Sequence, residues 1–302
     1  MTTQQTVDTA RVVPPLREQA ATTTRARRKR PRIKIGVELA ILLAAITTVV
    51  PIAWMLLLAF LPNRAIVDRD WSFPFWLGNF RELFGAGEPF FAQILNSVLI
   101  TGGTVALCLT IASISGYALS KLNPSKWATV PALVLAAFLP MIPPMTLVPG
   151  LYVMMGNLGL LGTIGGLILL NTVFNLPFSV LLLKSFFDQV PTELRESEQM
   201  DGASEARTFF AVVLPLVKPG LAAVGIYTAI MAWNEFLFGL TMTSGGRSAP
   251  FTVGIASLVQ PFAVTWGEMS AAGFIAAVPI VIVAVVANRQ IVTGLTVGAV
   301  KG

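Results

Sequence analysis

Long apolar runs dominate the pattern of hydrophobic and polar positions along the chain. Six of them are rich in Leu, Ile, Val and Ala, and they lie at residues 35–61, 94–119, 129–155, 163–183, 219–242 and 269–287. A helix that crosses the hydrocarbon core of a bilayer needs about 20 mostly apolar residues. Strands of a membrane barrel would instead alternate over segments of about 10 residues. Because the runs are continuous, the pattern predicts an all-α, polytopic membrane protein with six transmembrane helices.

The composition agrees with a chain whose main solvent is lipid. Of the 302 residues, 55% are hydrophobic and 12% are charged, and the mean hydropathy is +0.75. A soluble domain usually has about a quarter of its residues charged. The composition therefore excludes an ordinary soluble globular protein.

The third apolar run is interrupted by helix-breaking residues. They are Pro143, Pro144, Pro149, Gly150 and Gly156. Such breaks persist at membrane depth where neighbouring helices or a polar cavity satisfy the freed backbone groups. Two interpretations remain open at this point, a pathway in the middle of the membrane and a plain helix kink.

Lys and Arg are distributed unequally between the two sides that six crossings define. Seventeen of the 21 lie on the side that holds both ends of the chain, and nine of these precede the first run. The other side holds Arg64, Arg69, Arg81 and Arg247. Cytoplasmic loops carry an excess of Lys and Arg. The distribution predicts a multi-pass protein with both termini in the cytoplasm.

The chain before the first run is polar and basic. Residues 1–34 are rich in Thr, Ala and Arg and end in RARRKRPRIK, so we expect a disordered cytoplasmic tail followed by a membrane domain at 35–302. Basic runs can bind nucleic acid, but this one adjoins an apolar run directly. Setting the topology and attracting anionic lipid are sufficient roles for it, so the lipid bilayer is an expected partner and nucleic acid is not.

The residue inventory excludes several kinds of chemistry. The chain has no His, and its one cysteine, Cys108, lies inside the second run. Thiolate and imidazole metal sites are therefore not expected. No Walker A sequence is present, so we expect no ATP site. Carboxylates within the runs are few, which argues against a proton-coupled carrier.

One strongly charged segment lies between the fourth and fifth runs, on the side assigned to the cytoplasm. Residues 192–215 read TELRESEQMDGASEARTFFAVVLP. We expect Thr192 to cap a short helix that runs to about Met200 and ends at Gly202. We expect Ser204 to cap a second helix that Pro215 stops.

This segment has two possible roles. It could be a solvated loop whose charges keep it in water, or a compact element that docks on a partner. A solvated loop has no need of a tight glycine turn or of the adjacent Phe209 and Phe210. The pattern therefore favours docking.

The sequence of this segment resembles a known motif. The stretch ESEQMDGASEARTFFAVVLPLVKPG, residues 196–220, is similar to the cytoplasmic coupling loop of binding-protein-dependent ABC importer permeases. The matching residues are Glu196, Asp201, Gly202, Ala203, Leu214, Pro215 and Pro219. Ser197 and Glu198 stand where the family pattern has two alanines. The resemblance implies that a loop at about 188–218 couples to an ATPase through Glu196, Ser197, Glu198, Asp201, Gly202, Ala203 and Pro215.

Two further stretches narrow the resemblance, which extends over about residues 35–302. AWNEF at 232–236 and GLTVGAVKG at 294–302 are similar to carbohydrate-uptake permeases of the maltose-transporter type. This implies the type I ABC importer permease fold, with six transmembrane helices and a cytoplasmic coupling helix, in a bacterial cell membrane. It also implies a second sugar permease subunit, an ATPase subunit dimer and an extracytoplasmic solute-binding protein as partners. ATP and Mg would then bind the ATPase, leaving this chain without cofactor or enzymatic activity.

Sugar binding calls for amide groups and an aromatic face within a cavity. The candidates for the substrate pathway are Asn234, Trp233, Asn175 and Thr146. Each polar group could equally bond between helices as part of their packing. Two alternatives to a sugar importer remain, an ABC permease for a non-sugar solute and a secondary carrier.

Overall fold

The computed structural model describes residues 35–71, 75–85, 87–122, 124–260 and 263–298. The chain divides into two units, Met1–Thr48 and Val49–Gly302, and the packing described below lies within the second. The predicted tail at 1–34 and the last four residues lie outside the described part of the chain.

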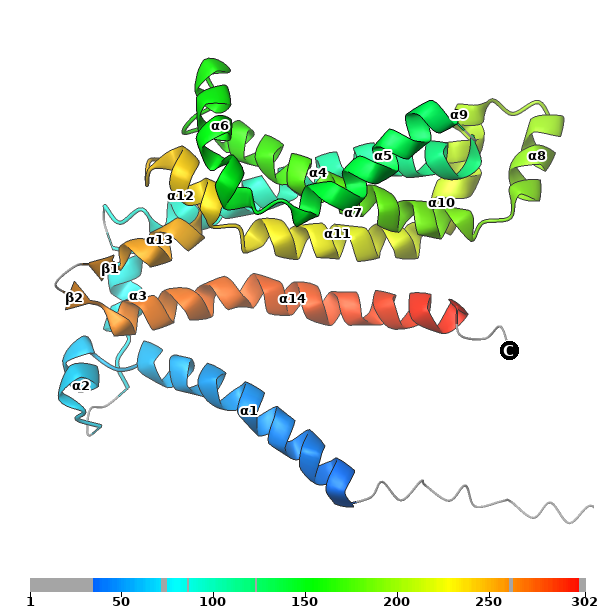
Figure 1. Cartoon of the computed structure of the whole chain (residues 1–302). Coiled ribbons are helices and arrows are strands. Elements are labelled where there is room, and N and C mark those ends of the chain that lie inside the picture. Colours follow the sequence, from blue (N-terminus) through cyan, green and yellow to red (C-terminus); the bar gives the residue numbers. More distant parts are fainter. Residues whose placement is uncertain (1–34, 72–74, 86, 123, 261–262, 299–302) are drawn as a thin grey trace, which may run out of the picture. The chain divides into compact units, whose positions relative to one another are not determined.

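Helices account for nearly all of the regular structure (Figure 1). In chain order the elements are α1 (Ile35–Ala59), α2 (Asn63–Asp68), α3 (Gly78–Leu83), α4 (Phe90–Lys121), α5 (Lys126–Phe138), the 3-10 helix η1 (Leu139–Met141), α6 (Pro144–Asn157), α7 (Ile164–Asp188), α8 (Thr192–Met200), α9 (Glu205–Thr208), the π-helix η2 (Phe209–Val213), α10 (Leu214–Leu216), α11 (Lys218–Trp233), α12 (Leu237–Thr243), α13 (Phe251–Ser257), β1 (Val259–Gln260), β2 (Ala263–Val264) and α14 (Trp266–Gly298). The two short strands pair antiparallel and are a local exception to the predicted all-α class.

Four described helices are individually long and apolar enough to cross a membrane. They contain Gly36–Ala59, Phe90–Lys121, Ile164–Asp188 and Trp266–Val285. Two bent helix pairs, at 129–157 and 205–233, bring the number to six if each pair is one span. The predicted helical membrane fold is confirmed, and the first, second, fourth and sixth runs each form one long helix.

The third predicted run is two helices instead of one. The axes at 129–141 and 144–157 are bent by 108°. The break lies at Ile142 and Pro143, which have extended ψ angles of 120° and 121°. A residue that precedes a proline is pushed out of the α region, and two successive prolines impose this twice. The prolines therefore produce a sharp corner, far more than a mild kink.

The fifth predicted run also divides into two helices. It was expected to continue from 219 to 242, but α11 ends at Trp233 and α12 starts at Leu237. The carboxylate of Glu235 accepts hydrogen bonds from the N–H groups of Phe238 (2.6 Å) and Gly239 (3.0 Å). Backbone N–H groups in the first turn of a helix have no acceptor within the helix. A carboxylate that accepts hydrogen bonds from them therefore favours the start of a new helix at this position.

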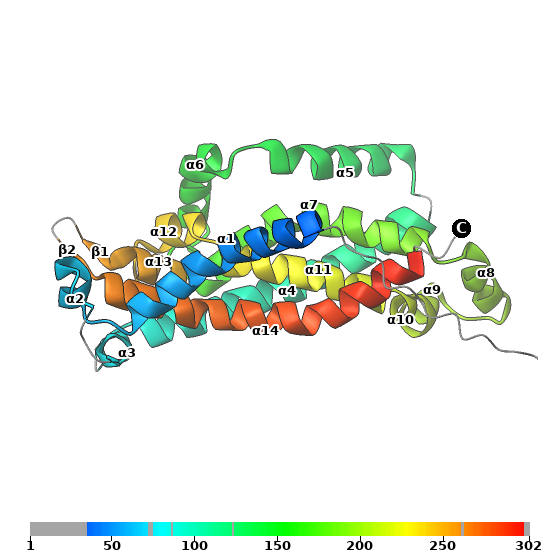
Figure 2. The ribbon, with the colours of Figure 1, turned by 90° about the horizontal axis from the view of Figure 1, so that it is seen from below.

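The centre of the second unit is formed by α4, α7 and α11, which pack against one another, with α14 packed on α11 (Figure 2). A Cβ atom added to Gly116 of α4 would lie 3.1 Å from the backbone nitrogen of Lys184 in α7. Small residues let helix backbones approach closely in membranes. Between α7 and α11, the hydroxyls of Ser179 and Thr228 lie 3.3 Å apart and are both buried.

Candidate functional site

The charged segment forms a short helix, a glycine turn and a second helix. The first helix is α8, and Gly202 follows it with a φ of +82°. The N–H of Ala203 donates to the carbonyl of Glu198 (2.9 Å), which closes the turn. Glycine adopts this left-handed conformation without the steric cost that a Cβ atom brings. The geometry of the predicted glycine turn is therefore present.

The first predicted cap is wrong. The N-cap position of α8 is occupied by Pro191, with a non-helical ψ of 135°, and no side chain caps the helix. Thr192 is instead the first helical residue. A side-chain oxygen caps a helix from the N-cap position, and Thr192 lies one residue past it.

The second predicted cap is present, although the helix behind it is irregular. The hydroxyl of Ser204 accepts a hydrogen bond from the N–H of Arg207 (3.4 Å). The helical path continues past Pro215 to Leu216, so the proline does not stop it as expected. The chain bends by 76° before α11 begins at Lys218. Proline is tolerated at this point because it lies in the first turn of α10.

The candidate coupling residues lie largely on an exposed surface. Glu196, Ser197, Asp201 and Gly202 are exposed, and Glu198 and Ala203 are half-buried. None of the residues of α8 is buried, and Met200 is 88% exposed. Figure 1 shows α8 standing apart from the long helices at one end of the second unit. Such a helix is open to contact by another protein.

The carboxylate of Glu205 joins α8 to the rest of the unit. It accepts two hydrogen bonds from the Arg195 guanidinium, each 2.8 Å long, and one of 2.6 Å from the amide of Gln199. The hydroxyl of Tyr117 in α4 donates to the same carboxylate. The paired carboxylate raises the pKa of Arg195 above its ordinary value, so the guanidinium keeps its charge.

The ring of Tyr117 lies in an aromatic cluster. Its centroid is 5.7 Å from that of Phe187 in α7 and 4.9 Å from that of Phe209. All three side chains are buried, whereas Phe210 is exposed. Nearby, the ammonium group of Lys121 donates to the carbonyl of Val190 (2.6 Å). The segment thus rests on the ends of α4 and α7.

Sequence reasoning missed Tyr117 and Glu205. The two residues are separated by 88 positions, and a tyrosine near the end of an apolar run is unremarkable in sequence. The spacing of Arg195 and Glu205 by ten residues also follows no helical period, because the turn at Gly202 intervenes. Only the tertiary structure brings these groups together.

Two of the pathway candidates lie where α11 ends. Asn234 is exposed, and its amide donates to the carbonyl of Ile230 (2.8 Å). Trp233 is buried, and its indole N–H donates to the carbonyl of Ala276 in α14 (3.1 Å). The Trp233 side chain therefore connects two helices. No group in the described part of the chain donates to the carbonyl oxygen of the Asn234 amide.

The other two candidates lie on different helices. Asn175, half-buried on α7, donates its amide to the carbonyl of Asn171 (2.8 Å). Thr146, exposed in the first turn of α6, donates its hydroxyl to the carbonyl of Pro143 (2.8 Å). Asn175 therefore bonds within its own helix, and Thr146 bonds to the residue that precedes its helix. A shared role of the two residues in a substrate pathway stays a prediction.

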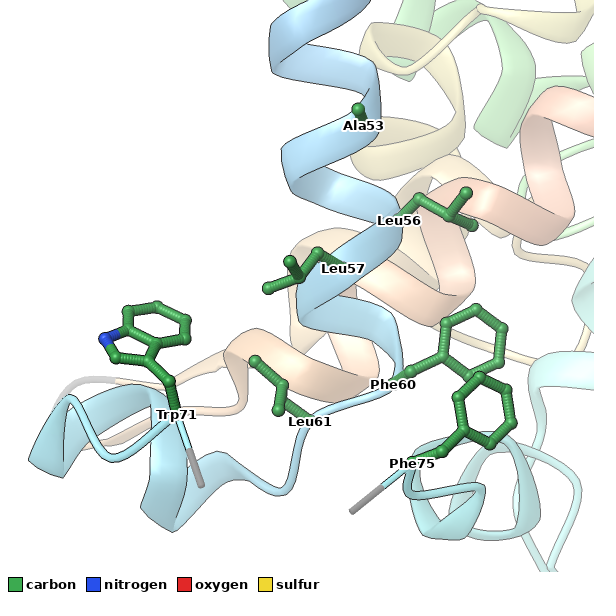
Figure 3. A pocket seen from close by; sticks show the side chains of 7 residues that line it. All are labelled: Ala53, Leu56, Leu57, Phe60, Leu61, Trp71 and Phe75. Carbon is green, nitrogen blue, oxygen red and sulfur yellow. The ribbon is translucent and has the colours of Figure 1, made fainter. Parts of the chain in front are cut away.

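A pocket of about 570 Å³ lies elsewhere, at the end of α1 (Figure 3). It is lined by Ala53, Leu56, Leu57, Phe60, Leu61, Trp71 and Phe75. Its wall is almost entirely apolar, whereas a sugar site needs several hydrogen-bonding groups. This pocket does not supply one.

Comparison with known proteins assigns the chain to a family. Residues 108–296 match the binding-protein-dependent transport system inner membrane component family. The chain belongs to this family. The match covers the charged segment and α7 and α11 on either side of it, so the chain is a multi-pass membrane permease component.

Relatives in this family align with most of the chain. The trehalose/maltose transport system permease protein MalG of Thermococcus litoralis is 32% identical over 264 residues, covering 86% of this chain and 94% of the relative. The trehalose transport system permease protein SugB of Mycobacterium tuberculosis is 31% identical and covers 83% of this chain and 92% of the relative. The sulfoquinovosyl glycerol transport system permease protein SmoH of Agrobacterium fabrum is 34% identical, covering 75% and 78%.

The fold is also that of a solved transporter. A chain in the crystal structure of a bacterial ABC transporter that imports the acidic polysaccharide alginate aligns with a TM-score of 0.70 at 20% identity. The alignment covers 84% of this chain and 95% of that chain. The predicted ABC importer permease fold is therefore confirmed.

Proposed function

We propose that this chain is a membrane permease subunit of an ATP-driven sugar importer and forms half of its translocation pathway. Family membership supports the permease role. The names of the trehalose and maltose permeases, which align with more than four fifths of the chain, support a sugar or glycoside as substrate. A non-sugar solute is the alternative substrate class, and a secondary carrier is the alternative mechanism.

The observation that carries the proposal is the exposed helix α8 with its turn at Gly202. A permease without a nucleotide site must receive the work of ATP hydrolysis through a docked element. We infer that an ATPase subunit holds α8, with Glu196 and Glu198 meeting basic groups on that partner. Ser197, Asp201 and Ala203 complete the contact surface, and Pro215 sets the path back into the membrane. A helix held in this way transmits a tilt, which a flexible loop does not.

The remaining partners follow from the same proposal. A second permease subunit completes the pathway, two ATPase subunits bind ATP and Mg, and an extracytoplasmic binding protein delivers the sugar. One solved relative of the fold is an alginate ABC transporter in complex with an alginate pentasaccharide-bound periplasmic protein. In this arrangement the chain itself is not an enzyme and holds no cofactor.

We further propose that both termini and α8 lie in the cytoplasm of a bacterial cell. The unequal distribution of Lys and Arg supports this orientation. It places Ser244, the residue that follows the last turn of α12, outside, at the opposite end of the membrane domain from α8.

Among the pathway candidates, Asn234 has the best support because it is exposed and its amide oxygen accepts from no donor among the described residues. Asn175 and Thr146 follow, since each has one donor bond to a backbone carbonyl and further capacity. Trp233 is less accessible because its ring is packed inside the unit.

The test uses the complete transporter, purified with its partner subunits and placed in proteoliposomes. Uptake of labelled trehalose, maltose, phosphate and an amino acid mixture is measured with and without ATP on the ATPase side, with the binding protein present. We expect ATP-dependent accumulation of a sugar. Accumulation without ATP would establish a secondary carrier, and ATP-dependent uptake of only a non-sugar solute would establish the alternative substrate class.

A further inference from the structure

Glu205 is the meeting point of three helices. As the first residue of α9, it accepts hydrogen bonds from Arg195 and Gln199 of α8 and from Tyr117 of α4. The Arg195 contact is bidentate, with both nitrogen–oxygen distances at 2.8 Å. Charge-assisted and bidentate hydrogen bonds are strong and directional. One carboxylate therefore fixes α8 relative to α4.

Apolar packing does not hold α8 in place. No residue of this helix is buried, and Leu194 and Met200 are both exposed. The backbone bond from Ala203 to Glu198 closes the turn but makes no contact with the long helices. The side-chain hydrogen bonds to Glu205 thus connect α8 to α4.

The other end of this connection is rigid. Tyr117 is 4% exposed, and its ring packs between Phe187 of α7 and Phe209. Close packing leaves such a ring few alternative positions. A displacement of the Tyr117 hydroxyl must therefore move the ring and the end of α4 with it.

We propose that Glu205 and Tyr117 are positioning residues that transmit the movement of α8 to α4. The inference rests on the proposed function, because it requires an ATPase that moves α8. When α8 tilts, the Arg195–Glu205 pair carries α9 along, and the Tyr117 hydroxyl passes the displacement to α4. The contact of Tyr117 with Phe187 extends the same displacement to α7, which packs along α4.

The principal test is Tyr117→Phe in the complete transporter. This change removes one hydroxyl and keeps the packed ring. We measure sugar uptake and ATP hydrolysis in the same proteoliposomes, using whichever of trehalose and maltose the wild-type complex accumulates faster. We expect the sugar transported per ATP to fall by several-fold and up to about tenfold, because a lost hydrogen bond to a charged group weakens the mechanical link. A residue that only stabilises the fold would lower the amount of complex but leave this ratio unchanged.

Tyr227→Phe is the matched control. Tyr227 lies on α11, is half-buried, and has its ring 4.4 Å from that of Phe178. Within the described part of the chain its hydroxyl makes no hydrogen bond. Removal of this hydroxyl should therefore leave the transport ratio unchanged.

A charge exchange provides a second test that depends on rescue. Arg195→Glu and Glu205→Arg should each uncouple hydrolysis from uptake, because each leaves two like charges facing one another. The double variant restores an opposite pair across the turn and should recover part of the lost ratio. Recovery supports the role of the Arg195–Glu205 pair. The double variant also lacks the carboxylate that accepts from Tyr117, so equal loss together with a reduced ratio in Tyr117→Phe supports the bond of Tyr117 to Glu205 as the decisive step. Equal loss together with an unchanged ratio in Tyr117→Phe contradicts the inference.

The two levels of proposal fail in different ways. Wild-type complex without ATP-dependent sugar uptake overturns the proposed function and, with it, this inference. Active wild-type complex together with an unchanged transport ratio in fully assembled Tyr117→Phe overturns only the role of Tyr117 and Glu205.

Discussion

Gly202 shows how a single residue controls the shape of the charged segment at 192–215. Its φ of +82° lies in the left-handed region, and a Cβ atom placed there would meet no atom within 4 Å in the described part of the chain beyond its immediate neighbours in sequence. A substitution at Gly202 therefore acts on the backbone conformation, and within this chain it causes no collision.

We predict graded effects of substitution at Gly202. Gly202→Val should reduce ATP-dependent uptake strongly, because a β-branched residue costs about 1–2 kcal/mol in the left-handed region and shifts the turn. Gly202→Asn should retain most uptake, since asparagine tolerates this conformation. The measurement is uptake normalised to protein in the membrane. Equal loss in both variants would show that a partner fills the space beside Gly202 and that backbone strain is not the cause.

At the scale of elements, the contact between α4 and α7 depends on a glycine. Gly116 is buried, and its Cβ position lies 3.1 Å from the backbone of Lys184, which cannot rotate away. Gly102, on the same helix, is exposed and has open space at its Cβ position.

We therefore expect that a larger side chain is tolerated at Gly102 and is not tolerated at Gly116. Gly116→Leu should separate α4 from α7 and destabilise the protein by about 1–3 kcal/mol, the usual cost of overpacking. Gly102→Leu should have little effect on stability. Thermal unfolding in detergent, followed by loss of monodisperse protein, measures both. Similar unfolding temperatures for the two variants would contradict the close approach of these helices.

For the whole molecule, the proposed orientation places α8 on the cytoplasmic side of the membrane and Ser244 on the outer side. A reagent that cannot cross the membrane should therefore reach only Ser244 in intact cells. Met200→Cys, on α8, should be protected from an impermeant thiol reagent in intact cells, and Ser244→Cys should react. Both positions are exposed in the structure. Cys108 is buried and serves as the internal negative control. Permeabilised cells should label at both introduced sites, and labelling of only Met200→Cys in intact cells would invert the topology.

The sequence by itself determined the helical membrane fold and the turn after α8. Continuous apolar runs have one favourable solution in a bilayer, since a helix satisfies its own backbone groups. The turn was predictable because glycine, the capping Ser204 and the charged flanks act over a few residues. The family resemblance also rested on these local residues.

The tertiary structure alone decided how the runs bend and what anchors α8. Two prolines at 143 and 144 bend one apolar run by 108°, and the carboxylate of Glu235 starts a new helix within another. Hydropathy does not distinguish such broken runs from straight helices. The contact between Tyr117 and Glu205 spans 88 residues and forms only when α4 and α7 pack together. The local sequence pattern does not predict such a contact. Which side chains meet between two helices depends on how the helices pack, and this does not follow from the spacing of residues along the chain.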